Sequence, residues 1–281
     1  MERIILLCMF SVCVSALQTP NFLLRPKWGP IGYRGREEPK DETAMDAIIK
    51  ANEFLASRVI DGTTTLREGD IAVSSGRRAK VCFARSCLWN KSVDGHVYIP
   101  YRVSPEYTEV ETKLIKKGME NIEKGTCVRF VPLTHQRDYI DIVPQSGCWS
   151  YLGSRGGRQT VSLQSPQCLQ VGVISHEFMH SLGFVHEQSR FDRDNYVTIM
   201  WPNIWRDRLR NFEKFRTESL DLPYDYSSIM HFGKYAYSQD GEPTIIPKNS
   251  QKIKLGQSSS LSHLDKLKIN KLYNCGDTDD N

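Results

Sequence analysis

The stretch "SHEFMHSLGFVHEQSR", residues 175 to 190, constrains the fold of this chain more than any other. It holds three of the chain's seven histidines, His176, His180 and His186. Apolar residues recur at steps of three and four from Val171 to Leu182, which predicts a helix with one buried face. His176 and His180 lie one turn apart on another face of that helix, so their rings can reach a common point.

A glycine follows at Gly183, where a left-handed residue commonly ends a helix. The sharp turn allows His186 to return toward the two helical histidines. Three converging neutral imidazoles leave the fourth position of a tetrahedral zinc open for water, as in catalytic zinc sites. Glu177 lies between the helical histidines and is the natural general base for that water. We therefore predict one Zn²⁺ per chain and hydrolysis of peptide bonds.

The alternative is that these are ordinary surface or core histidines. A bare HExxH occurs by chance often enough to be only moderate evidence. The extended pattern HExxHxxGxxHE fixes six positions, and its chance occurrence in a chain of this size is on the order of one in a million. The zinc interpretation is therefore strongly favoured.

The N-terminus reads "MERIILLCMFSVCVSALQTP" and has the pattern of a secretory signal peptide. Arg3 is the basic residue, Ile4 to Val14 the apolar core, and Ala16 ends a small-residue cleavage site. We predict a signal peptide over residues 1–16 and a secreted, extracellular protein. A membrane anchor is disfavoured, because a spanning helix needs roughly 20 apolar residues.

Six of the eight cysteines remain once the signal peptide is removed. They are Cys82, Cys87, Cys127, Cys148, Cys168 and Cys275. An even number in an oxidising compartment predicts that all are paired, although spacing leaves the connectivity open. The sequon at Asn90 predicts an exposed loop that can carry a glycan.

All of these cysteines lie beyond the basic pair Arg77-Arg78, which ends a small-residue segment of the kind that proteases cut. We predict a propeptide over residues 17–77 and a disulfide-bonded catalytic domain over residues 78–281. An activating protease is the expected partner at the boundary.

Periodicity and turn residues predict the main elements. We expect helices starting at Thr43, at Ser104-Pro105 and at Ser262, and one around residues 204–215, with strands at 96–104, 127–133, 139–144 and from Cys148. The 37 basic and 33 acidic residues give a net charge of +4. The basic residues are scattered, so we expect no nucleic-acid partner and no membrane partner.

The extended histidine pattern is the metzincin signature. With Glu187 after the third histidine and "SIMHFG" at 228 to 233, the chain resembles the astacin family over nearly everything after residue 78. The resemblance implies an α+β fold with two lobes. The upper lobe would hold a twisted, mostly parallel sheet and the active-site helix, and the irregular lower lobe would hold a C-terminal helix.

The resemblance also implies a disulfide pattern. It would join Cys127 to Cys275 and Cys148 to Cys168, which leaves Cys82 and Cys87 for a small extra loop. This additional pair resembles the six-cysteine astacins of fish, which include hatching enzymes (choriolysins) and nephrosin-like proteases.

Further site residues follow from the resemblance. Asp70, after Gly69, matches the aspartate that occupies the water's position on zinc in the proform. The family's Phe two residues before the glycine is Arg67 here, so only the Gly-Asp core supports this role, and a simple turn residue is the alternative. Glu187 would bind the new α-ammonium after processing, unless it is merely exposed. Met230 would form a hydrophobic floor beneath the zinc. The alternative is a plain core methionine, which has almost the same physical content.

Substrate would bind as an extra antiparallel strand along an edge strand at Trp149, Ser150 and Tyr151, since main-chain pairing gives affinity with little sequence demand. Astacins usually carry Tyr two residues after the methionine, as a donor to the developing oxyanion, but this chain has Phe232. Losing such a donor typically costs roughly 10² to 10³ in kcat. The offsets of Tyr235 and Tyr237 do not match that position.

The sequence therefore predicts a secreted zinc endopeptidase made as a zymogen. It would act as a monomer on protein or peptide substrates in extracellular or egg-envelope material. The alternative is a catalytically weak astacin-like zinc protein that binds a partner, an interpretation which Phe232 favours. The intact Glu177, the histidines, Asp70 and the cleavable proregion favour the protease, because latency is useless without activity.

Overall fold

The computed structural model describes residues 42–55, 59–60, 62–74, 87–215, 220–250 and 252–276, all within one unit that spans Pro39–Asn281. Some predictions concern residues outside these ranges. They are the signal peptide over 1–16, the processing site at Arg77-Arg78, and the pairing of Cys82.

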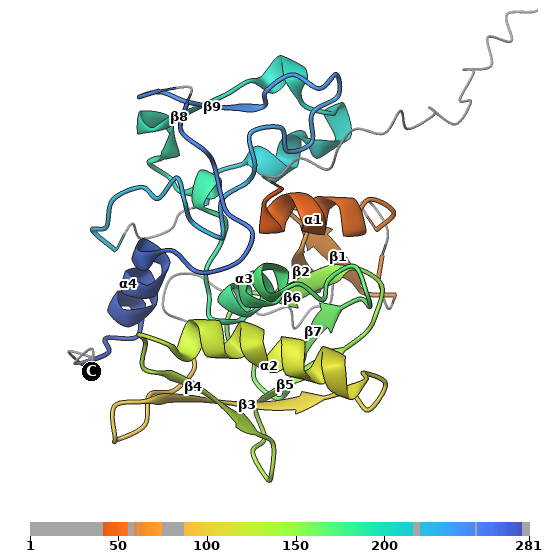
Figure 1. Cartoon of the computed structure of the whole chain (residues 1–281), viewed down its shortest axis with the longest axis vertical. Coiled ribbons are helices and arrows are strands. Elements are labelled where there is room, and N and C mark those ends of the chain that lie inside the picture. The colour runs from red at the N-terminus through yellow and green to blue at the C-terminus, as the bar shows by residue number, and fades with distance from the viewer. Residues whose placement is uncertain are drawn as a thin grey trace, which may run out of the picture. The chain divides into compact units, whose positions relative to one another are not determined.

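A seven-stranded sheet forms one lobe (Figure 1). Its strands are β1 (Thr64–Arg67), β2 (Ile71–Ser74), β3 (Val97–Val103), β4 (Val128–Pro132), β5 (Tyr139–Val143), β6 (Cys148–Tyr151) and β7 (Arg158–Leu163). Their order across the sheet is β1-β2-β6-β7-β5-β3-β4. The pairs β2/β6, β3/β4, β3/β5 and β5/β7 are parallel, whereas β1/β2 and β6/β7 are antiparallel. The predicted mostly parallel sheet is therefore confirmed.

In the part of the chain that the structure describes, four α-helices accompany the sheet: α1 (Ala44–Ala51), α2 (Glu109–Glu123), α3 (Val171–Ser181) and α4 (His263–Leu272). Thr43 caps α1 and Ser262 caps α4, each in a capping box with an aspartate at the third helical position. The prediction that α2 begins at Ser104-Pro105 was wrong. Thr108 and Glu111 form its capping box, so the helix starts four residues later.

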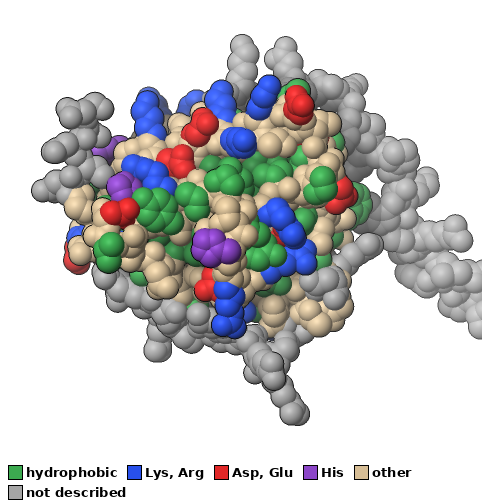
Figure 2. Space-filling view, turned by 90° about the horizontal axis from the view of Figure 1, so that it is seen from below, with side chains coloured by type: hydrophobic (Ala, Val, Ile, Leu, Met, Phe, Trp, Pro, Cys, Tyr) green, Lys and Arg blue, Asp and Glu red, His purple; other side chains and the backbone are tan. Residues whose placement is uncertain are grey.

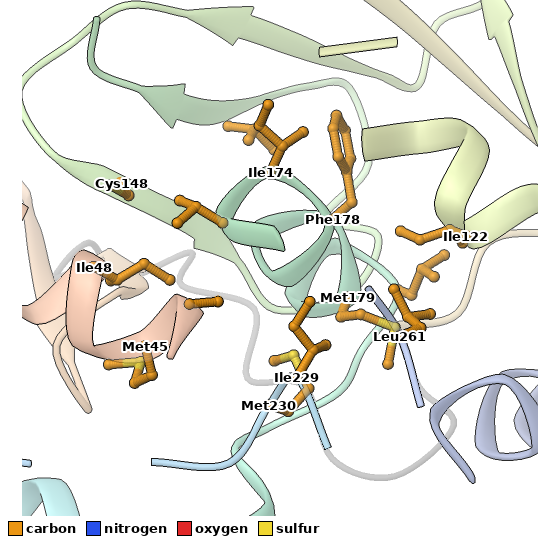
Figure 3. Packing of buried hydrophobic residues seen from close by; sticks show 14 of the residues in the cluster. Met45, Ile48, Ile122, Cys148, Ile174, Phe178, Met179, Ile229, Met230 and Leu261 are labelled. Carbon is orange, nitrogen blue, oxygen red and sulfur yellow. The ribbon is translucent and has the colours of Figure 1, made fainter. Parts of the chain in front are cut away.

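The helix α3 lies at the centre of the core, and its residues from Gly172 to Ser181 are all buried. Figure 3 shows Met45 and Ile48 of α1 on one side of it and Ile122 of α2 on the other. Phe178 meets Phe130 of β4 edge to face, with 5.0 Å between ring centroids. Truncating a buried phenylalanine to alanine costs about 3–5 kcal/mol. The position of the two helical histidines is therefore fixed by the packing of the whole sheet lobe.

Residues 185–215 and 220–250 form the second lobe, which is irregular, as expected. It holds a two-stranded antiparallel sheet of β8 (Val197–Ile199) and β9 (Ile245–Pro247), together with short 3₁₀ helices. The helix predicted around residues 204–215 is a 3₁₀ helix, η5 (Arg206–Phe212). Only Phe212 of its seven residues is buried, so no apolar face supports a longer α-helix. Figure 1 draws this lobe above the sheet, the reverse of the upper and lower convention used for the resemblance.

The C-terminal helix α4 is tied to the sheet lobe. The Cys127–Cys275 disulfide joins the segment just beyond α4 to the residue that precedes β4, and the Tyr273 hydroxyl donates to the Leu182 carbonyl. Among the described residues, no helix combines the length and the apolar character needed to cross a bilayer. Figure 2 shows Lys and Arg side chains at several separate places on one face, with Asp and Glu among them.

Candidate metal centre

Three histidines and one aspartate meet beside α3. His176 and His180 project from consecutive turns of that helix, and Gly183, with a φ of +103°, ends it. The chain then turns back and brings His186 to the same point. One ligand atom from each of these histidines and from Asp70 lies within 4.8 Å of the others, and all four side chains are buried. The predicted convergence of the histidines is thus present in the structure.

Asp70 reaches this point from the hairpin of β1 and β2. Its Oδ2 atom lies 2.9 Å from Nε2 of His176, 3.4 Å from Nε2 of His180 and 3.2 Å from Nε2 of His186. A carboxylate oxygen therefore stands at the centre of the three imidazoles. This is the place at which the sequence predicted the aspartate of the proform.

Each imidazole also uses its other nitrogen. Nδ1 of His176 contacts the Ile229 carbonyl at 2.9 Å, and Nδ1 of His180 contacts the Phe184 carbonyl at 2.7 Å. A carbonyl can only accept, so both Nδ1 atoms carry hydrogen and both neutral rings present an Nε2 lone pair to the common point. This outer set of acceptors is the usual support for metal-bound histidine.

The donor set fits zinc. Imidazole nitrogen and carboxylate oxygen are both common zinc ligands. Within the described part of the chain, His180 Nε2 and Asp70 Oδ1 are buried with no hydrogen-bond partner, a costly arrangement for a protein without a metal. The arrangement of these four residues therefore fits a zinc site.

The charges at the site act on one another. Burial lowers the pKa of His176 to about 4. Burial also disfavours the charged form of His186, but the carboxylates of Asp70 and Glu68 outweigh it and raise the pKa of that ring to about 9. For Asp70, burial is again outweighed, and the charges of His186 and His180 hold its pKa well below the usual range.

Glu177 lies in the same buried region. Neither of its carboxylate oxygens has a hydrogen-bond partner among the described residues. Burial, and then the charge of Asp70, raise the pKa of this carboxyl well above its usual value. A buried carboxyl group with a strongly raised pKa and no hydrogen-bond partner among the described residues is a candidate for proton transfer.

Sequence reasoning missed Glu68. Its side chain is fully buried, its Oε2 accepts from Nδ1 of His186 at 2.7 Å, and its Oε1 accepts from the Ser189 hydroxyl at 2.8 Å. Its backbone is left-handed, with a φ of 54°. The available signal was a second acidic residue in the same short turn as Asp70.

Asn52 was missed as well. It follows α1, and its amide group donates to the carbonyls of Gly69 and Cys148 and accepts from the Cys148 N–H. One buried side chain thus holds the turn before Asp70 against the start of β6.

The comparison with protein families decides what this arrangement is. The family model described as Astacin, a peptidase family, matches residues 87–274, about two thirds of the chain. The chain belongs to the astacin family. Zinc is the metal of these peptidases, in agreement with the donor set.

Individual astacins are similar over much of the chain. A high choriolytic enzyme 1 from Oryzias latipes is 44% identical over 75% of this chain and 78% of that protein. A solved structure of that hatching enzyme zinc-protease covers 70% of this chain and 99% of its own, with a TM-score of 0.67. An astacin-like metalloendopeptidase from Gallus gallus is 42% identical over 85% of this chain. The chain spans 56% of the length of that relative.

The strand expected to bind substrate is covered in this astacin. Trp149 and Ser150 of β6 are buried, and Tyr151 is partly buried. Ile71 and Ala72 of β2 pair with Ser150 and Tyr151 in parallel, and the Ser150 N–H donates to the Asp70 carbonyl at 3.1 Å. On its other side β6 pairs with β7. The N-terminal segment therefore occupies the edge of β6 at which we expected substrate to bind, and it runs parallel to β6 rather than in the expected antiparallel direction.

Glu187 already has partners. Its carboxylate accepts from Arg190 at 3.1 Å, from Lys268 at 2.6 Å and from the Asp225 N–H at 2.8 Å. A buried carboxylate needs a cation, and two are present without any α-ammonium group. The alternative, that Glu187 is merely an exposed glutamate, is excluded because the residue is buried, whereas its pairing with a new N-terminus remains a prediction.

The turn around Met230 supports the site. Met230 is buried, close to Ile229 and Met179 (Figure 3). Its carbonyl accepts from the Glu187 N–H at 3.0 Å. Phe232 is fully buried, and its ring lies 4.7 Å from that of His186 at an angle of 61°. The position that lacks a hydroxyl thus lies directly beside the third histidine.

The structure joins Cys127 to Cys275 and Cys148 to Cys168, the two pairs implied by the resemblance. Cys82 is outside the described residues, so its pairing with Cys87 remains a prediction. Asn90 is exposed, as a glycan acceptor must be.

Proposed function

We propose that this chain is the zymogen of a secreted zinc endopeptidase, kept latent by residues 62–74 and activated by cleavage near Arg78. The observation that carries this proposal is the position of Asp70, whose one oxygen faces all three histidines. Asp70 would fill the position that the catalytic water requires, which explains both why the histidines converge there and why the intact chain would be latent.

The protein's own residues divide the chemistry. When bound, zinc supplies a Lewis acid that polarises the substrate carbonyl and makes water acidic enough to react near neutral pH. The three histidines hold the metal through Nε2. A carboxylate oxygen of Glu177 accepts the proton of the attacking water and delivers it to the nitrogen of the departing amine. General acid and base catalysis of this kind contributes roughly 10² to 10⁴ in rate.

Latency has a second component in this proposal, the pairing of β2 with β6. A substrate that adds a strand to β6 needs its free N–H and C=O groups. Ile71 and Ala72 occupy them in parallel register, which is the reverse of the antiparallel direction proposed for substrate. Removal of the segment would open the metal and the strand edge together.

The proposed substrates are extracellular proteins, including proteins of the egg envelope. The support is the similarity to high and low choriolytic enzymes of Oryzias latipes, at 44% and 43% identity. An activating protease is the proposed second partner, and the active form is proposed to be a monomer.

One observation favours the alternative, a zinc protein that binds a partner with little turnover. Phe232 places a bare aromatic ring next to His186 and supplies no donor to a developing negative charge. If that donor is not replaced, the loss typically amounts to roughly 10² to 10³ in kcat.

The proposal is tested with Glu177→Gln in protein processed near Arg78. We expect one bound zinc, an unchanged fold, and a hydrolysis rate reduced by roughly 10² to 10⁴. Glu120→Gln is the matched control, because Glu120 is an exposed glutamate of α2. Full activity of the Glu177 variant would exclude this residue as the base.

A further inference from the structure

Phe232 has no hydroxyl group, but the neighbouring ring of Tyr237 carries one. Tyr237 packs against Phe232 with 5.8 Å between ring centroids, and Phe232 in turn packs against His186. The three rings form a row that leads from the third histidine to Tyr237. The sequence offset alone did not suggest this, since Tyr237 lies five residues beyond Phe232.

The hydroxyl of Tyr237 ends against the segment that closes the site. A β-carbon added to Gly69 would lie 2.0 Å from this oxygen, so the hydroxyl is in contact with the Gly69 backbone, one residue from Asp70. Only glycine fits there, both because of this contact and because Gly69 has a φ of +98°. When residues 62–74 leave, the hydroxyl faces the space that Gly69 occupied.

The local structure holds this group in place as a donor. Tyr237 has a φ of 55°, a conformation that costs a residue with a side chain about 1–3 kcal/mol and persists where the surroundings enforce it. Burial, and then the charge of Asp70, raise the pKa of the phenol, so it carries its proton at neutral pH.

We propose that Tyr237 is a catalytic residue which replaces the donor missing at Phe232, by donating a hydrogen bond from its hydroxyl to the substrate carbonyl oxygen as that oxygen becomes negative. This inference rests on the proposed peptidase function. In the intact chain, Gly69 covers the hydroxyl, so the removal of one segment exposes the metal site and this donor together.

The first test compares Tyr237→Phe with Tyr235→Phe in processed protein. Tyr235 is a neighbouring tyrosine, 54% exposed, and serves as the control. We expect Tyr237→Phe to lower kcat by roughly 10² to 10³ with little change in KM or zinc content. Phe232→Tyr added to Tyr237→Phe should restore part of the rate.

A binding measurement separates this role from a structural one. Calorimetry with a phosphinic peptide, whose tetrahedral anion resembles the transition state, should show affinity reduced in parallel with kcat in Tyr237→Phe. Affinity for a product peptide should change little. An unchanged kcat and unchanged phosphinate affinity would overturn the inference, while wild-type protein that binds zinc and does not hydrolyse peptides would instead overturn the peptidase proposal.

A second test does not depend on activity. In the intact chain, Gly69→Ala should lower the hydrogen-exchange protection of residues 64–74, and Tyr237→Phe should restore part of it, because the ring carbon at 3.4 Å is an ordinary contact. Gly62→Ala is the control, since Gly62 also has a positive φ of 78° but nothing within 4 Å of the added carbon. Strictly additive effects of the two substitutions would show that the hydroxyl is not at Gly69.

Discussion

Glu68 lies 2.7 Å from Nδ1 of His186, whereas Asp70 faces Nε2 of the same ring at 3.2 Å. Two carboxylates from a single three-residue turn therefore hold both nitrogens of one histidine. The acceptors for His176 and His180 are carbonyls of the peptidase domain itself, so only His186 depends on the N-terminal segment for its outer partner.

Replacing Glu68 should weaken latency. In Glu68→Gln a hydrogen bond to a carboxylate becomes a neutral one, and charged hydrogen bonds contribute roughly 1.5–3 kcal/mol. We expect hydrolysis by the uncleaved chain to rise on the order of 10-fold. Glu53→Gln, in the same N-terminal segment and exposed, is the control. If the uncleaved Glu68 variant hydrolyses peptide no faster than the control, Glu68 does not contribute to latency.

Replacing Asp70 should have the larger effect. Asp70→Ala removes the only group of the segment that faces all three Nε2 atoms, and we expect premature hydrolysis by uncleaved protein at a rate well above that of Glu68→Gln. The progress curve of a quenched peptide, with gel analysis to verify that the chain is intact, measures this. Continued latency would show that strand pairing alone closes the site.

Asn52→Ala should loosen the segment without touching the metal. The change removes three hydrogen bonds and takes this partner from the buried main-chain groups of Cys148 and from the partly buried carbonyl of Gly69, at roughly 1–3 kcal/mol for each buried group left unpaired. Limited proteolysis should cut residues 62–74 faster, with unchanged zinc content. Lys50→Ala, an exposed change on α1, should leave the cutting rate unaltered. Equal rates in the two variants would argue against Asn52 as the link.

His231 should make the fold sensitive to acid. Burial lowers its pKa to about 4, although hydrogen bonding to Phe232 and the charges of Glu187 and Asp225 act in the opposite direction. The unfolded chain has a histidine pKa near ~6.5 and binds the proton first, so stability is lost as pH falls from ~6.5 to ~4, by roughly 3 kcal/mol.

The measurement is urea unfolding of His231→Gln at a series of pH values. The variant should be less stable at pH ~7 but lose less stability on acidification than wild type. His135→Gln, a change at an exposed histidine, is the control and should keep the wild-type dependence of the unfolding free energy on pH. Any loss of metal on acidification affects both variants equally, so it cancels in the comparison. Equal slopes in both variants would contradict the account.

The zinc-binding helix could be predicted because its signals are local. The apolar spacing, the i, i+4 histidines and the terminating glycine all lie between Val171 and Gly183, and the structure places them as expected. The capping residues Thr43 and Ser262 likewise predicted the starts of α1 and α4, which the structure confirms. For α2, Pro105 was a misleading signal, because it lies in the turn before the Thr108 cap.

Features that depend on long-range contacts could not be predicted. β1 and β2 have four residues each, too few for a periodic signal, and β2 is stabilised by pairing with a strand almost 80 residues away. The role of Asn52 could not be predicted for a similar reason, since its partner Cys148 lies 96 residues further along the chain. The contact of Tyr237 with Gly69 joins residues from two lobes, and only the folded chain brings them together.

The most direct test compares hydrolysis of a quenched peptide library by the intact chain and by the chain cleaved near Arg78, at equal zinc content and with a hydroxamate control. The account predicts hydroxamate-sensitive cleavage by the processed protein and almost none by the intact chain. Equal rates in both forms would contradict the closure by residues 62–74. One bound zinc with no hydrolysis in either form would contradict the peptidase itself.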